Sequence, residues 1–292
     1  MPNITIIGPG AIGGIVAAWL AQTPANTVSV CARTPFAALQ IDTPRGPITA
    51  RPAIQLKPEQ CAVADWVLIA TKAYDVAGAA AWLPNLIGPG TRIAILQNGV
   101  EHMERFTPYA DPACLVPVVV DIPAERRAPG EVWQRREGTM LVADTPNGRD
   151  FAGLFAEAGI AVSTDPDLRS RAWRKLAINC AGAVSAVTLK PASVSQREDI
   201  AAIMRDMVRE CMAVGRAEGA FLDDTLPDEV VASYRDSPPD SLNSLHADRA
   251  AGRPMEIDAR NGVIVRIGRR HGIAAPVNQT IVALLEAAAA EP

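Results

Sequence analysis

This sequence is poor in histidine and aromatic residues and carries no large excess of charge. Its 292 residues include three histidines, and the aromatic share is 4%. The five cysteines are far apart and form no C-x-x-C pair, so the pattern of a metal centre is missing and we expect no metal site. The net charge of −4 lacks the basic footprint of nucleic-acid-binding proteins, so we expect no nucleic-acid partner.

Long hydrophobic runs are also missing. No apolar stretch is long enough to cross a bilayer, and no basic segment followed by an apolar one precedes the run ITIIG near the start. We therefore expect no membrane association and a cytoplasmic location. The cysteines are interpreted as buried thiols of a reducing compartment. They are Cys31, Cys61, Cys114, Cys180 and Cys211.

Short β-branched runs alternate with helix-like stretches over the first 96 residues. The runs ITIIG, TVSVCAR, DWVLIATKA and RIAILQNG are typical of βαβ units and a parallel sheet. Two later runs, CLVPVVVDI and GTMLVAD, lie on either side of the turn APGE and are expected to extend or cover that sheet. The prediction is an α/β fold whose N-terminal domain, residues 1–166, is a Rossmann-type doubly wound sheet.

Helical periodicity replaces the strand pattern after residue 166, which predicts a C-terminal all-helical domain over residues 167–292. Apolar residues recur on one face of two segments and predict two buried stripes. The stripes consist of Trp173, Leu176, Ala177, Cys180 and Val184, and of Ile203, Met204, Met207, Val208 and Cys211. A further helix is predicted to begin at Pro254 and to end at Gly272.

The run GPGAIGG contains the pattern G-x-G-x-x-G at Gly8, Gly10 and Gly13. Such glycines permit a tight turn, close approach of the backbone to a pyrophosphate, and close packing of helix on strand. A glycine-rich turn without a ligand is the alternative. Here a strand-like run precedes the pattern and a helix-like run follows it, which favours a dinucleotide site at the helix N-terminus. The predicted cofactor-binding residues of this loop are Gly8, Pro9, Gly10, Ala11, Ile12 and Gly13.

The end of the second predicted strand distinguishes the two nicotinamide cofactors. An acidic residue there binds a free ribose 2′-hydroxyl, whereas an arginine accommodates a 2′-phosphate. The sequence reads VCARTPF, so Arg33 occupies this place and NADPH is favoured over NADH. The alternative is that Arg33 is a solvated surface charge.

Reduction of a carbonyl group needs a proton donor or a cation beside the carbonyl oxygen. The three histidines, His102, His246 and His271, are interpreted as surface or helix-capping residues. Lys175 is the better candidate, because it shares one helix face with Asn179 in the run WRKLAINC. A solvated polar face explains the same spacing, and periodicity alone leaves both interpretations open.

Several motifs, taken in order along the chain, resemble the ketopantoate reductase family. They read GPGAIGG, ATKAYD, LQNGV, WRKLAINC, GRPMEID and HGIAAPVN. The resemblance implies an oxidoreductase that uses NADPH to reduce a 2-oxo acid, in this family ketopantoate to pantoate in pantothenate biosynthesis. It also implies a helical domain that carries substrate-binding and catalytic residues. A homodimer is a possible assembly that the sequence does not fix.

The resemblance assigns the chemistry to the helical domain. The family's proton donor falls on Lys175, and a substrate-binding asparagine falls on Asn179. Glu256 matches a glutamate that lies beside cofactor and substrate, so it is a candidate for both catalysis and substrate binding. Its negative charge would help to keep the lysine protonated.

Three further positions match family residues that contact ligands. Lys72 matches a cofactor contact after the fourth strand of the family's pattern. Asn98 matches an asparagine that faces both the nicotinamide and the substrate, and Ser244 matches a serine that contacts the substrate.

The chain departs from the family pattern at Ala183, where a second substrate-binding asparagine is usual. The stretch VPVVVDIPAERRAPGEVW also lacks the usual threonine-rich pattern. Both departures concern the substrate pocket, which leaves open a paralogue that reduces a different 2-oxo acid. A non-catalytic NADPH-binding sensor is a further alternative, although a sensor needs neither Lys175 nor Glu256. An interaction module that only dimerises would leave the glycine loop unexplained.

Overall fold

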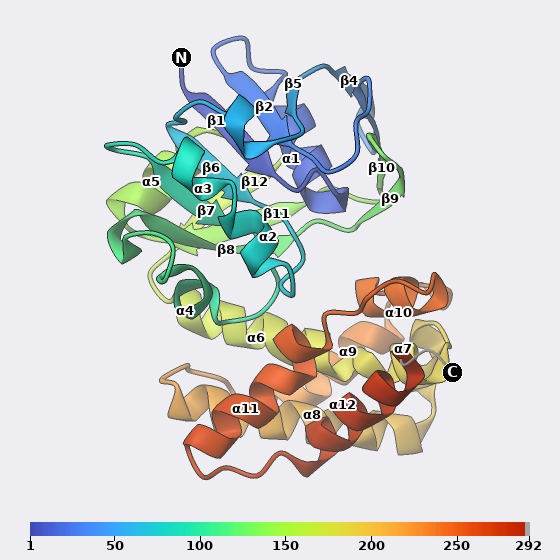
Figure 1. The fold of residues 1–292 in the computed structure, drawn as a ribbon. Coiled ribbons are helices and arrows are strands. Elements are labelled where there is room, and N and C mark those ends of the chain that lie inside the picture. The colour runs from blue at the N-terminus through green and yellow to red at the C-terminus, as the bar shows by residue number, and fades with distance from the viewer. Residues whose placement is uncertain (290–292) are drawn as a thin grey trace. The chain divides into compact units, whose positions relative to one another are not determined.

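The structure is a computed structural model that describes residues 1–289, so residues 290–292 at the end of the predicted second domain lie outside the described part. The contacts of the chain divide it into two compact units (Figure 1). The first comprises residues 1–97 and 101–168, and the second comprises residues 98–100 and 169–292. Within residues 1–289, no helix has both the length and the apolar character needed to cross a membrane.

A mostly parallel sheet forms the centre of the first unit. Its strands lie in the order β12 (Ala161–Asp165), β11 (Thr139–Ala143), β8 (Leu115–Asp121), β7 (Arg92–Ile95), β6 (Trp66–Ile69), β1 (Asn3–Ile7), β2 (Thr27–Cys31) and β5 (Ala53–Gln55). Only β8 and β11 pair in antiparallel fashion within this sheet of the described chain. The chain order reverses between β1 and β6, and such switch points are where ligands bind in open α/β sheets.

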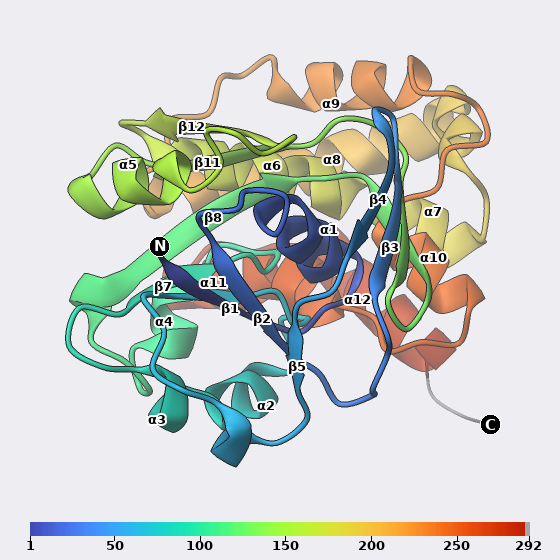
Figure 2. The ribbon, with the colours of Figure 1, turned by 90° about the horizontal axis from the view of Figure 1, so that it is seen from above.

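Helices cover both faces of this sheet. Leu68 of β6 points into one core, while its neighbours Val67 and Ile69 point into the other. The first core also contains residues of α1 (Ala11–Leu20) and α5 (Pro146–Gly153); the second contains residues of α2 (Val76–Ala80), α3 (Leu83–Leu86) and α4 (His102–Phe106). Figure 2 shows α1 and α2 on opposite sides of β1 and β2. The predicted doubly wound sheet is confirmed.

A second, smaller sheet packs on α1 and was not expected from the sequence. Its strands lie in the order β4 (Gly46–Ala50), β3 (Leu39–Thr43), β10 (Glu131–Gln134) and β9 (Ala124–Ala128). The predicted turn APGE joins β9 to β10, and Gly130 in this turn has a φ of +81°. The runs on either side of the hairpin form β8 and β11, so the prediction that they extend the large sheet is confirmed.

The second unit is helical, as predicted, and appears in yellow to red in Figure 1. Its helices are α6 (Leu168–Ala181), α7 (Ala183–Thr188), α8 (Glu198–Ala217), α9 (Leu226–Arg235), α10 (Ser244–Ala250), α11 (Val263–Arg270) and α12 (Pro276–Ala289). Both predicted stripes lie in one core, with one exception. Ile203 is 38% exposed, because the buried face of α8 is centred on Met204, Met207 and Cys211 instead.

Two helix boundaries differ from the prediction. The chain breaks the first predicted helix at Gly182, where a Cβ would lie 2.2 Å from the Tyr234 hydroxyl oxygen. The helix expected to begin at Pro254 begins at Ile257, and its first turn over Asp258–Gly262 is a π-helix. Proline permits a helix start but does not require one.

Buried polar contacts join four helices of the second unit. Asn261 donates to the side chain of Asn278 at 2.9 Å and to the carbonyl of Cys180 at 3.2 Å. Asn278 in turn donates to the carbonyl of Met207 at 3.1 Å and to the carboxylate of Glu210 at 2.7 Å. These bonds offset much of the cost of burying the two amides, while Asn261 Oδ1 has no hydrogen-bond partner among the described residues. The network thereby links α6, α8, α12 and the π-helical turn before α11.

The network yields a stability prediction. Replacement of Asn278 by alanine should lower the free energy of unfolding by about 2–4 kcal/mol, because Asn261 and Glu210 lose a buried partner. Gln279→Ala, on the exposed side of the same helix, should change it by less than about 0.5 kcal/mol. Urea denaturation of both variants measures the difference, and equal effects would show that the network does not hold the helices together.

Candidate functional site

The loop between β1 and α1 contains glycines that the fold itself requires. Gly8 has a φ of +86°, and a Cβ at this position would lie 2.8 Å from Thr71 Cγ2. A Cβ on Gly13 would lie 2.3 Å from the carbonyl oxygen of Gly8. Any larger residue would therefore strain the turn or push α1 away from the sheet.

Gly10 has different surroundings, because a Cβ there would meet no atom within 4 Å. Gly10 is the N-cap of α1, and its carbonyl accepts the first helical hydrogen bond from Gly14 at 2.9 Å. The helix thus offers no acceptor to the N–H groups of Ala11, Ile12 and Gly13. Open space in front of such N–H groups fits a pyrophosphate, while the preceding Pro9 shapes the turn without donating a bond.

Arg33 lies two residues beyond the end of β2. Its side chain is 86% exposed, and its Nη1 lies 3.3 Å from Oδ2 of Asp75. An exposed guanidinium at this strand end suits a ribose 2′-phosphate, which would compete with Asp75 for the same cation. The exposure also fits a solvated charge, so the role of Arg33 stays a prediction.

Lys72 lies in the segment after β6. It directly follows Thr71, the residue that a Cβ on Gly8 would meet. The side chain of Gln97, at the end of β7, donates to Thr71 Oγ1 at 3.0 Å and to the carbonyl of Lys72 at 3.2 Å. These bonds fix the backbone of Lys72 at the switch point of the sheet. The predicted contact of Lys72 with the cofactor stays a prediction.

The helix α6 positions the predicted proton donor. Lys175 and Asn179 are one turn apart and partly buried. The opposite side of the helix places Trp173 and Leu176 in the core of the second unit. Burial of one face therefore fixes the direction in which Lys175 and Asn179 extend.

The carboxylate of Glu256 is almost completely enclosed. Glu256 is 5% exposed, and its Oε2 accepts a hydrogen bond from Asn98 Nδ2 at 3.0 Å. Asn98 follows β7 in the sequence but belongs to the second unit by its contacts. A buried carboxylate is unfavourable without hydrogen-bond donors, and Asn98 supplies one to Glu256. The structure thus brings together two predicted site residues that lie 158 positions apart.

Ser244 is the first residue of α10 and is exposed. The N-cap before it is Asn243, whose side chain accepts a bond from the backbone N–H of His246 at 3.0 Å. This cap fixes the start of α10 and hence the position of Ser244. Its predicted contact with substrate stays a prediction.

The interpretation of the histidines as surface residues is wrong for two of them. His102 is buried, and its Nε2 is 2.7 Å from the carbonyl oxygen of Gln97. His246 is also buried, and its Nδ1 is 3.0 Å from the carbonyl oxygen of Ser185. In each ring a nitrogen lies within hydrogen-bond distance of a backbone carbonyl, a contact that short sequence patterns do not reveal. His271 ends α11, as a capping residue, and pairs with Glu218 at 2.5 Å.

One charged residue near these groups was missed at the sequence level. Arg260 is 2% exposed and donates from Nη2 to the backbone carbonyl of Asn179. The signal was present, because Arg260 falls on the same helical face as the buried Val263, Ile264 and Ile267. An arginine within an apolar stripe predicts a buried charge, which is rare and therefore a candidate for a functional role.

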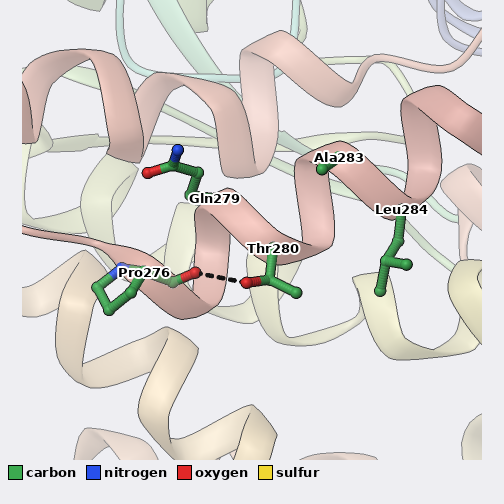
Figure 3. Close-up of a pocket in the computed structure, with 5 residues that line it drawn as sticks. All are labelled: Pro276, Gln279, Thr280, Ala283 and Leu284. Carbon is green, nitrogen blue, oxygen red and sulfur yellow. Dashed lines mark hydrogen bonds between the residues drawn. The ribbon is translucent and has the colours of Figure 1, made fainter.

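A pocket with a volume of about 470 Å³ runs along α12. Its lining comes from this one helix: Pro276, Gln279, Thr280, Ala283 and Leu284 (Figure 3). The hydroxyl of Thr280 donates to the carbonyl of Pro276 at 2.9 Å, and Figure 3 shows this bond along the helix. None of the predicted site residues lines the pocket, so it is not the candidate site.

The chain thus combines an α/β unit of dinucleotide-binding type with a helical unit that carries a lysine, asparagines and a buried glutamate. The family model described as "Ketopantoate reductase PanE/ApbA" matches residues 4–147, and its "C terminal" counterpart matches residues 167–289. The chain belongs to the ketopantoate reductase family.

Similar proteins cover the whole chain. The "2-dehydropantoate 2-reductase" of Caulobacter vibrioides is 57% identical over 289 residues, which is 99% of this chain and 100% of that protein. The solved structure of a PanE/ApbA family ketopantoate reductase from Ralstonia eutropha has a TM-score of 0.90 at 32% identity and covers 98% of both chains. A dimeric ketopantoate reductase from Staphylococcus aureus has a TM-score of 0.88 at 23% identity, again over 98% of both chains, and shares the fold.

The glycine loop separates the requirements of folding from those of binding. Gly13→Ala should lower the free energy of unfolding by about 1–3 kcal/mol, because the new Cβ overlaps the Gly8 carbonyl. Gly10→Ala should leave stability within about 0.5 kcal/mol of wild type and weaken NADPH binding at least tenfold, because its Cβ fills the open space. Denaturation and fluorescence titration measure the two quantities. Unchanged NADPH affinity in Gly10→Ala would remove the loop from the cofactor site.

Arg33 predicts the choice of cofactor. NADPH should bind at least tenfold more tightly than NADH, a difference of about 1.4 kcal/mol or more. Arg33→Ala should abolish most of that preference while leaving NADH affinity unchanged, because only the 2′-phosphate meets the guanidinium. Titration of both proteins with both cofactors tests this, and equal affinities in the wild type would identify Arg33 as a solvated charge.

Proposed function

We propose that this protein reduces ketopantoate (2-dehydropantoate) to pantoate with NADPH, as a step of pantothenate biosynthesis in the cytoplasm. The observation that carries the proposal is the full-length identity of 57% to a 2-dehydropantoate 2-reductase. The arrangement around Glu256 supports it, because a buried carboxylate held by Asn98 is a costly feature that a binding sensor does not need.

The first unit holds the cofactor in this proposal. The N–H groups at the start of α1 bind the pyrophosphate, with Gly8 and Gly13 fixing the turn and Gly10 leaving space. Arg33 binds the 2′-phosphate, and Lys72 contacts the cofactor beside the loop. When bound, NADPH supplies a hydride to the carbonyl carbon of the substrate.

Lys175 provides the proton in this proposal. Its ammonium group lies against the ketone oxygen, stabilises the negative charge that develops there, and transfers a proton to it. Glu256 favours the protonated lysine through its negative charge and accepts a hydrogen bond from a substrate hydroxyl. Asn98 holds the Glu256 carboxylate in place with its bond of 3.0 Å and faces nicotinamide and substrate.

Asn179 and Ser244 bind the polar groups of the substrate. Asn179 can donate and accept hydrogen bonds, which suits a hydroxy acid that offers both kinds of group. Ala183, one turn beyond Asn179, cannot contribute such a bond, and its side chain is fully buried. A different 2-oxo acid is therefore the second candidate substrate.

A homodimer completes the proposal. The ketopantoate reductase from Staphylococcus aureus that shares this fold is described as dimeric. Light scattering on the purified protein gives the mass in solution, and a monomer at all concentrations would remove this part of the proposal.

Substitution of the proton donor tests the catalytic assignment. Lys175→Ala should lower kcat for ketopantoate by two or more orders of magnitude, because general acid catalysis contributes about 10²–10⁴-fold. The affinity for NADPH should stay within about twofold of wild type, because Lys175 has no assigned contact with the nucleotide. Lys190→Ala, which removes an exposed lysine, is the matched control. Full turnover in Lys175→Ala would exclude this residue as the proton donor.

A further inference from the structure

Arg260 is a buried cation with few partners. Its Nη2 donates to the carbonyl of Asn179, and its Nε is enclosed without a hydrogen bond. Among the described residues, no carboxylate forms an ion pair with it. Burial lowers the pKa of Arg260, while the nearby Tyr234 and Glu256 oppose that shift. A buried charge without a close counter-charge is strongly unfavourable, so the fold retains this arginine at a cost in stability.

Two of the residues near Arg260 are ones proposed to bind the substrate, beside Tyr234 and Cys180, which are not. Asn179, whose carbonyl it contacts, is a predicted substrate ligand. Glu256 lies four residues before it and is enclosed to a similar degree, at 5% against 2% exposure. Ala183, where the family usually has a substrate-binding asparagine, lies one turn beyond Asn179. The carbonyl that Arg260 contacts thus belongs to a residue four positions before Ala183, where the family pattern has a polar side chain.

Capping of α6 does not by itself account for this arginine. The helix ends at Ala181, and the carbonyl of Asn179 needs a donor near that end. A guanidinium has five N–H donors, however, and this contact uses one of them. Arg249 provides a comparison, because it donates to the carbonyls of Ala186 and Val187 at the end of α7 while staying partly exposed. Capping therefore does not require a fully buried charge.

We propose that Arg260 binds the carboxylate of the 2-oxo acid and replaces the hydrogen bond that Ala183 cannot make. The inference rests on the proposed function, whose substrate is an anion at neutral pH. Lys175 loses its positive charge when it transfers its proton, so it cannot balance the carboxylate throughout the reaction. An arginine stays charged and can bind a carboxylate through two parallel hydrogen bonds. The two cations thus serve different groups of the same substrate.

The test compares the carboxylate substrate with a neutral analogue that has the same ketone. Arg260→Met removes the charge and keeps much of the side-chain volume. We expect its kcat/KM for ketopantoate to fall at least 100-fold, while kcat/KM for the uncharged ketopantoyl lactone stays within threefold of wild type. Arg260→Lys keeps a charge without the planar fork, so KM for ketopantoate should rise about tenfold with kcat within threefold of wild type. It also serves as the test if Arg260→Met does not fold.

Arg249→Met is the matched control, because it removes a capping arginine from the same unit. It should lower thermal stability without changing the preference for the acid over the lactone. An equal loss on acid and lactone in both Arg260 variants, or no loss on either, would overturn the role in carboxylate binding. If the wild type reduces no 2-oxo acid with NADPH, the proposed function itself fails, and this inference falls with it.

Discussion

The helical unit depends on two charged side chains, Glu256 and Arg260, that are buried from water. Glu256 and Arg260 lie four residues apart and are 5% and 2% exposed, so water can solvate neither of them well. Glu256 obtains a hydrogen bond from Asn98, and Arg260 binds the backbone carbonyl of Asn179 on α6. A buried charge tolerates little displacement of its partners, because each lost bond leaves it uncompensated. This constraint fixes the segment before α11 against α6, the helix that carries Lys175.

The first unit depends on a steric constraint instead. Gly13 brings α1 so close to the turn after β1 that a single methyl group would overlap the carbonyl of Gly8. Gly10 faces open space at the same helix terminus. One loop thus combines positions where the fold requires glycine with a position where the fold leaves open space. Gly13 is needed for a stable turn, whereas the space at Gly10 is the feature by which the motif predicts nucleotide binding.

Much of the fold could be predicted because periodicity reports burial directly. The alternation of runs predicted the parallel sheet, and the stripe around Met207 predicted the core of α8. The small sheet beside α1 was missed, since pairing of β3 with β10 joins segments about 90 residues apart. The contact between Asn98 and Glu256 spans a longer separation still; the family resemblance marked both as site residues but did not predict the bond between them. The burial of Arg260 was not predicted, although this residue shares a helical face with the apolar Val263, Ile264 and Ile267.

The central claim is that this chain transfers hydride from NADPH to ketopantoate. The most direct measurement follows NADPH oxidation by absorbance, with the purified protein and equal concentrations of ketopantoate or one of several other 2-oxo acids. The account predicts that ketopantoate is reduced fastest and that pantoate accumulates in step with NADPH consumption. A clear preference for another 2-oxo acid would contradict the assigned substrate, and no oxidation with any of them would contradict the assignment as a reductase.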